Sequence, residues 1–180
     1  TAKAWVVLGA AICVAVLPIA EFTAAVSNAT EYYVVPTGND GNDGLSPATA
    51  WASIQHGYTA AVLVPGDTVQ ILAGTYSTTG SITLSLSGTA TDPIVYRGPD
   101  SGGAVVDAGG GGFAALELTA NHLWIENLEV TNTSGEGVRL DGDSCVLVSC
   151  YTRGGMSDAV FVTGADNTLH HCVLQGPSTY

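Results

Sequence analysis

The sequence predicts an all-β fold, a parallel β-helix solenoid with about 22 residues in each coil. Three observations predict it. Aligning the chain with itself at an offset of 22 residues brings apolar residues into columns. Within each coil the apolar positions alternate, as in "ALEL", "GVRL" and "AVFV", which is the period of a β-strand. Gly, Asn, Asp and Ser fill the segments between the strands, where no amphipathic helical stretch occurs.

Residues 1–29 are interpreted as a secretory signal peptide. Lys3 precedes an apolar stretch from Trp5 to Ala20, and Ser27 and Ala29 are small residues at the positions that a signal peptidase reads. The alternative is an uncleaved membrane anchor, but the apolar stretch is shorter than the roughly 20 residues that a spanning helix needs. We therefore expect a secreted or cell-surface protein with no membrane contact after cleavage.

Residues 30–66 are predicted to form an N-terminal strand, a loop and a capping helix. The strand is "YYVV", and the helix is expected over residues 47–64, beginning at Pro47. Trp51, Ile54 and Tyr58 then fall on one helical face. The open end of a solenoid exposes its apolar interior, so a terminal cap is needed there.

The loop between this strand and the helix contains the sequence "GNDGND". Its Asp40, Asn42 and Asp43 are suitable calcium ligands, and they are equally suitable turn formers. The calcium-binding nonapeptide repeat works only as a stack of copies, and no second copy follows here. This favours turn formers that lead the chain into the cap.

Residues 67–180 are predicted to form the coils, with the last coil stopping before its final strand, as in a fragment of a longer protein. "GDTVQILAGTY" supplies the first strand, with Val69 and Ile71 inward and Gln70 outward. The expected inward columns are Ile94, Leu116, Val138 and Val160; Tyr96, Leu118, Leu140 and Val162; Leu84, Val106, Leu128, Cys150 and Cys172; Leu86, Ala108, Val130, Thr152 and Leu174; and Ile125, Leu147 and Leu169.

Cys150 and Cys172 share one inward column on neighbouring coils. Two interpretations are open, a disulfide or a pair of buried free thiols. Side chains stacked in parallel point the same way, which does not suit the disulfide dihedral angle. The free thiols, packing as small hydrophobic side chains, are favoured.

The charge of the chain is strongly acidic, with a formal net charge of −12. Beyond the signal segment the only basic residues apart from histidine are Arg97, Arg139 and Arg153. A surface this acidic repels phosphate backbones, which argues against binding nucleic acid. It suits cation binding instead.

Two segments resemble a known group of proteins. "YYVVPTGNDGNDGLSPATAWASIQ" with "VPGDTVQILAGTY" resembles the N-terminal cap of secreted right-handed parallel β-helix proteins, and "DPIVYRGPDSGGAVVDAG" resembles their second coil. That group includes family 9 and related polysaccharide lyases, and also proteins with no known activity. The resemblance implies right-handed coils and, for the lyases, an acidic polysaccharide bound along one sheet, a calcium ion held by acidic residues, and a Lys or Arg base.

The candidate site lies on one outward row, expected to be Gln70, Val95, Glu117, Arg139 and Phe161, flanked by Thr119, Asp141 and Thr163. Arg139 is the candidate catalytic base, and Glu117, Arg139 and Phe161 are the candidate substrate-binding residues. Asp141, Asp143 and Asp158 are the candidate calcium ligands. The alternative is that Glu117 and Arg139 form only a surface ion pair. Family 9 uses a Lys base. No lysine lies beyond the predicted signal segment, which weighs against an enzyme of that type within these residues.

His170 and His171 are expected to have a structural or surface role, with one of them at a bend. Two functions remain open. One is the N-terminal part of a secreted, calcium-assisted uronate lyase that acts by β-elimination. The other is a non-catalytic β-helix that serves as a surface, adhesive or glycan-binding protein, and a phage-type tailspike is a less favoured third.

Overall fold

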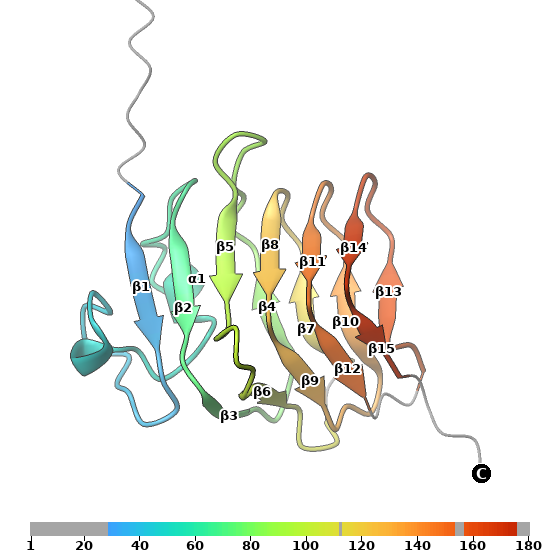
Figure 1. The fold of residues 1–180 in the computed structure, drawn as a ribbon, viewed down its shortest axis with the longest axis horizontal. Coiled ribbons are helices and arrows are strands. Elements are labelled where there is room, and N and C mark those ends of the chain that lie inside the picture. The colour runs from blue at the N-terminus through green and yellow to red at the C-terminus, as the bar shows by residue number, and fades with distance from the viewer. Residues whose placement is uncertain (1–28, 112, 154–156, 176–180) are drawn as a thin grey trace, which may run out of the picture.

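The computed structural model describes residues 29–111, 113–153 and 157–175. They form three parallel sheets that wind into one solenoid, with the termini at opposite ends (Figure 1). The chain visits the three sheets in turn, and each strand pairs with the strand one coil away. This confirms the predicted parallel β-helix. The predicted signal peptide falls outside these residues apart from Ala29. None of the helices within the described ranges has the length and apolar character needed to cross a membrane.

The three sheets are named here A, B and C. Sheet A contains β1 (Glu31–Val34), β2 (Thr68–Ile71), β5 (Ile94–Arg97), β8 (Leu123–Glu126), β11 (Val146–Val148) and β14 (Thr168–His170). Sheet B contains β3 (Gly74–Ser77), β6 (Ala104–Asp107), β9 (Glu129–Thr131), β12 (Tyr151–Arg153) and β15 (Val173–Leu174). Sheet C contains β4 (Ile82–Leu84), β7 (Ala114–Leu118), β10 (Glu136–Leu140) and β13 (Val160–Val162).

The 22-residue register is confirmed from β7 onward. Leu116 pairs with Val138, which pairs with Val160. The same spacing holds in the other two sheets, through Ile125 and Leu147 in sheet A and through Val130 and Thr152 in sheet B. Up to β12 the inward apolar side chains of these columns are buried and form one continuous core inside the solenoid. In the last coil Val162, Leu169 and Leu174, which were expected to point inward, are exposed.

Before β7 the predicted register is wrong. Ile94 pairs with Leu123 in sheet A, not with Leu116 in sheet C, and Val106 pairs with Val130 instead of Leu128. The cause is the length of the early coils. Thr83 and the residue opposite it on β7 are 34 positions apart, because long connections follow β4, β5 and β6.

The capping helix predicted over residues 47–64 is mostly absent. Only a 3-10 turn (η1, Pro47–Thr49) and one short α-helix (α1, His56–Thr59) form. Between them Trp51 is extended, because its backbone N–H donates to Tyr33 O and its carbonyl accepts from Val35 N–H. The Trp51 ring is buried and stacks on Tyr32, so the segment still covers the end of the solenoid.

The "GNDGND" loop is built from turn-forming side chains, as predicted. Asp40 accepts hydrogen bonds from Ala52 N–H, Ser53 N–H and the Ser53 hydroxyl at 2.8, 3.0 and 2.7 Å. Asp43 accepts from Leu45 N–H at 3.0 Å, and the Asn42 amide donates to Ala50 O at 3.3 Å. These bonds fix the path from β1 into the cap.

The cysteines beyond the predicted signal segment are free thiols, as favoured from the sequence. Each donates to a carbonyl of the preceding coil at the same offset of 25 residues, for example Cys150 to Ile125 O and Cys172 to Leu147 O, both at 3.5 Å. Cys150 and Cys172 therefore satisfy backbone acceptors at the corner between sheets A and B. His171 lies at that corner with a positive φ of 56°, which confirms that one of the two neighbouring histidines sits at a bend.

Candidate functional site

The outward face of sheet C carries a row of four side chains with different chemistry. Backbone pairing aligns Thr83, Glu117, Arg139 and Phe161 on β4, β7, β10 and β13. Successive side chains of a strand point to opposite faces, so these four point away from the core columns that flank them. Parallel strands lie about 4.8 Å apart, which places a hydroxyl, a carboxylate, a guanidinium and an aromatic ring at regular intervals along the solenoid.

Two residues expected in this row lie elsewhere. Gln70 and Val95 belong to sheet A, where Gln70 pairs with Arg97 and Val95 pairs with Thr68. The reason is the longer early coils, which shift the 22-residue alignment before β7. The position predicted for Val95 in the row of sheet C is taken by Thr83.

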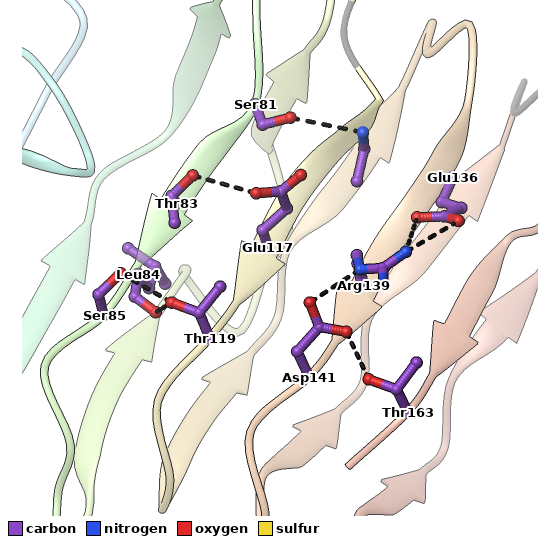
Figure 2. Close-up of polar contacts among 11 residues, drawn as sticks. Ser81, Thr83, Leu84, Ser85, Glu117, Thr119, Glu136, Arg139, Asp141 and Thr163 are labelled. Atoms are coloured by element: carbon purple, nitrogen blue, oxygen red, sulfur yellow. Dashed lines mark hydrogen bonds and ion pairs between the residues drawn. The ribbon is translucent and has the colours of Figure 1, made fainter.

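Arg139 is held by two carboxylates from its own segment (Figure 2). Its Nε–H donates to Asp141 Oδ2 at 2.8 Å, and its Nη1 lies 3.4 Å from both carboxylate oxygens of Glu136. The hydrogen bond to Asp141 is the main cause that raises the pKa of Arg139, and it is also the main cause that lowers the pKa of Asp141. Both groups are therefore fixed in their charged forms near neutral pH.

Two aromatic rings flank this guanidinium. The central carbon of Arg139 lies 5.2 Å from the ring centroid of Phe113 and 4.9 Å from that of Phe161. Both distances are within the range of a cation–π interaction. Phe113 stands 65% exposed just before β7, so its ring is accessible from solvent.

A second row, two residues further along each strand, is rich in hydroxyl groups. Ser85 and Thr119 share a hydrogen bond at 2.7 Å, and the Thr163 hydroxyl donates to Asp141 Oδ1 (Figure 2). In the first row the Thr83 hydroxyl donates to Glu117 Oε2 at 3.2 Å. The face of sheet C is thus a continuous set of hydroxyl and carboxylate groups next to aromatic rings.

The surface ion pair considered between Glu117 and Arg139 is absent. The two residues are directly opposite in the register, but in the described part of the chain the ion pairs of Arg139 join it to Glu136 and Asp141. Arg139 is therefore paired with two carboxylates from β10 and the residue that follows it, and not with Glu117 on the neighbouring coil.

The three candidate calcium ligands do not form one group. Both carboxylate oxygens of Asp141 already accept hydrogen bonds, from Arg139 and Thr163, and Asp143 Oδ1 accepts from Ala165 N–H at 2.7 Å. Among the described residues no three His, Cys, Asp or Glu side chains are placed to hold a metal ion. The structure therefore does not gather Asp141, Asp143 and Asp158 into one group, and both their role as ligands and calcium as a cofactor stay predictions.

The contacts of Arg139 favour binding over proton removal. A base must be able to lose its proton, and the raised pKa of this guanidinium opposes that. The assignment of Arg139 as catalytic base stays a prediction that its environment does not favour. His170 and His171 are exposed, with ring centroids 3.9 Å apart, and they lie at β14 and the corner after it, not on sheet C.

Sequence reasoning missed Glu136 and Phe113 as partners of Arg139. Strand alternation places residues three positions apart on opposite faces, so the spacing of Glu136 and Arg139 gives no signal of contact. Phe113 lies just before its strand, outside the aligned columns.

Comparison with known families places the fold in a defined group. The family model described as "Pel9A-like, right handed beta helix region" matches residues 32–176. The chain belongs to this family. The match covers the cap and the coils, and it gives the solenoid the right-handed turn that the resemblance implied. A search of curated proteins finds no match to this chain.

Three enzymes with solved structures, two lyases and one lacto-N-biosidase, share the fold. A rhamnogalacturonan lyase is 17% identical with a TM-score of 0.62, over 80% of this chain and 51% of that one. A GH136 lacto-N-biosidase from Eubacterium ramulus is 18% identical with a TM-score of 0.66, over 83% and 35%. The pectate lyase Pel9A is 22% identical with a TM-score of 0.55, over 82% and 48%. This chain spans about half of their length or less.

Proposed function

We propose that this chain is the polysaccharide-binding part of a secreted, carbohydrate-active β-helix protein, and that the glycan lies across the strands of sheet C. The single observation that carries the proposal is the row of Glu117, Arg139 and Phe161. It combines a carboxylate and a guanidinium, which can bond sugar hydroxyls, with a ring on which a sugar can pack.

The regular spacing of this face supports the same proposal. One outward side chain is presented per coil at the strand separation, so a linear polymer with repeating units meets one row of contacts after another. The family and the fold favour a carbohydrate as the partner, because the solved structures with this fold include a rhamnogalacturonan lyase, a lacto-N-biosidase and a pectate lyase.

Uronate β-elimination is the second candidate activity, and membership of the Pel9A-like family favours it. It needs a base beside the sugar, together with a way to neutralise the uronate carboxylate. Lys3 is the only lysine of the chain and lies in the predicted signal segment. Arg139 is tied to two carboxylates. We therefore propose glycan binding, and not proton removal, as the role of sheet C.

The test is affinity electrophoresis of the chain in gels that contain single polysaccharides, beside assays for unsaturated products by ultraviolet absorbance. Pectate, rhamnogalacturonan, alginate and uncharged glycans are compared, each with and without calcium. We expect retarded migration in at least one polysaccharide and no unsaturated product. Unretarded migration in every gel would overturn the proposal, and an unsaturated product would assign lyase activity to this chain.

A further inference from the structure

We propose that the face of sheet C takes an uncharged glycan in preference to a polyuronate. This inference rests on the proposed function, that sheet C binds a polysaccharide, and names the class of ligand. Sugar hydroxyls would bond its carboxylates and hydroxyls, and the apolar faces of sugar rings would pack on Phe113 and Phe161.

Arg139, the only Lys or Arg among the described residues of this face, is already neutralised by two carboxylates. Arg139 donates Nε–H to Asp141 and Nη1–H to Glu136, and its central carbon lies within cation–π distance of the Phe113 and Phe161 rings. A uronate carboxylate would have to displace one of these carboxylates or approach beside them. Binding a new anion in exchange for an existing one gives little net gain in free energy.

The formal charge of the face is negative. Three carboxylates, those of Glu117, Glu136 and Asp141, surround one guanidinium (Figure 2). Glu117 stands opposite Arg139 without forming an ion pair to it. A polyuronate carries a charge on every sugar, so each coil that it crosses adds repulsion between like charges.

Nothing else among the described residues offsets this charge. Arg97 lies in sheet A and pairs with Glu126, and Arg153 lies in sheet B and pairs with Glu129. The acidic side chains of the described ranges do not converge into a metal-binding group that could bridge to a uronate.

An uncharged glycan uses the same groups favourably. Its hydroxyls can donate to Glu117 and Asp141, and they can donate to or accept from Ser85 and Thr119. Phe113 and Phe161 lie on either side of Arg139. Phe113 is exposed and Phe161 is half-buried, so covering them with the apolar face of a sugar removes apolar surface from water.

The experiment compares polysaccharides that differ only in charge. Polygalacturonate, rhamnogalacturonan and alginate are each tested beside their own carboxyl-reduced product, which keeps the backbone and linkages. Binding is measured by isothermal titration calorimetry at low and high salt, with and without calcium chloride. For any backbone that binds, we expect the reduced form to bind at least about tenfold more tightly. We also expect salt to strengthen residual binding of the charged form, because it screens repulsion.

A charge variant separates electrostatics from shape. Glu117→Gln removes one carboxylate without breaking the contacts of Arg139. We expect it to reduce the difference in affinity between each charged polysaccharide and its carboxyl-reduced product. Asp100→Asn, on the exposed loop between sheets A and B, is the control and should leave the gap unchanged.

The outcomes distinguish the two proposals. If a charged form binds as tightly as its reduced form or more tightly, the preference for uncharged glycans is wrong, although sheet C can still be a glycan-binding face. If no backbone binds in either form, the proposed function itself fails.

Discussion

Glu117 and Arg139 stand directly opposite each other on β7 and β10, yet they do not form an ion pair, because Arg139 is bonded to Glu136 and Asp141. The carboxylate of Glu117 instead accepts a hydrogen bond from the Thr83 hydroxyl on the preceding coil. This arrangement leaves sheet C with an acidic face in which the guanidinium is fixed in place.

Asp40 is predicted to be the main polar anchor of the cap. Asp40→Ala removes the acceptor of three hydrogen bonds from Ala52 and Ser53, and we expect a loss of about 2 kcal/mol in the free energy of unfolding. Asp43→Ala is the control. Its carboxylate accepts from Leu45 N–H in an exposed turn, so the loss should stay below about 1 kcal/mol. Urea denaturation measures both, and equal losses would contradict the prediction.

Acid is predicted to destabilise the fold through carboxylates with lowered pKa values. Burial raises the pKa of Asp40, but hydrogen bonds from Ser53 and Ala52 outweigh it, and the net shift is downward. The Arg139 hydrogen bond lowers the pKa of Asp141. Such groups contribute stability that is fully present above the unfolded pKa of about 4 and is lost as the pH falls through the lower folded pKa.

The measurement is the melting temperature from about pH 6 to about pH 2, compared with the Asp40→Asn variant. We expect the variant to lose less stability than the wild type over this range, because it lacks one of the titrating groups. Parallel curves would show that Asp40 does not contribute in this way.

Gly142 is predicted to be required by the close stacking of coils. A Cβ at this position would lie 1.9 Å from Ala120 O, a backbone atom of the preceding coil that cannot move aside. We expect Gly142→Ala to cost at least about 2 kcal/mol. Gly80→Ala is the matched control, since no atom lies within 4 Å of its added Cβ. Chemical denaturation that finds the two variants equally stable would show that the coils are spaced differently.

Thiol reactivity is predicted to follow burial along the cysteine column. Burial raises the pKa of Cys150 to about 12, and its side chain is nearly inaccessible. Since the thiolate is the reactive form, iodoacetamide should modify the partly exposed Cys172 well before Cys150 in the native protein. Mass spectrometry of peptides from a timed reaction gives both rates, with Cys172→Ser identifying the fast phase. Faster modification of Cys150 would place it outside the core.

The fold could be predicted from the sequence where successive coils have equal length, because a fixed offset then aligns their inward residues. From Ala114 onward the coils meet this condition, and the pairing of Leu116 with Val138 was predictable. Earlier coils carry insertions, so a fixed offset placed Ile94 opposite the wrong partner. No local pattern reveals the length of an insertion before the pairing is known.

The candidate site was partly predictable for the same reason. Glu117, Arg139 and Phe161 lie in the regular coils and were correctly aligned. The partners of Arg139 were not, because contacts with Glu136 and Phe113 depend on side-chain direction at strand ends. The prediction of a long capping helix was wrong because the backbone of Trp51 pairs with β1. This tertiary pairing overrides the helical spacing of the apolar residues around it.

The central claim, that sheet C binds the glycan, is tested most directly by removing one aromatic ring from each of two sheets. Phe161→Ala removes the ring on sheet C, and Trp124→Ala removes an exposed ring on sheet A. With the tightest-binding glycan in calorimetry, we expect Phe161→Ala to weaken binding about tenfold and Trp124→Ala to leave it unchanged. Unchanged binding by Phe161→Ala together with loss in Trp124→Ala would place the glycan on sheet A and contradict the account.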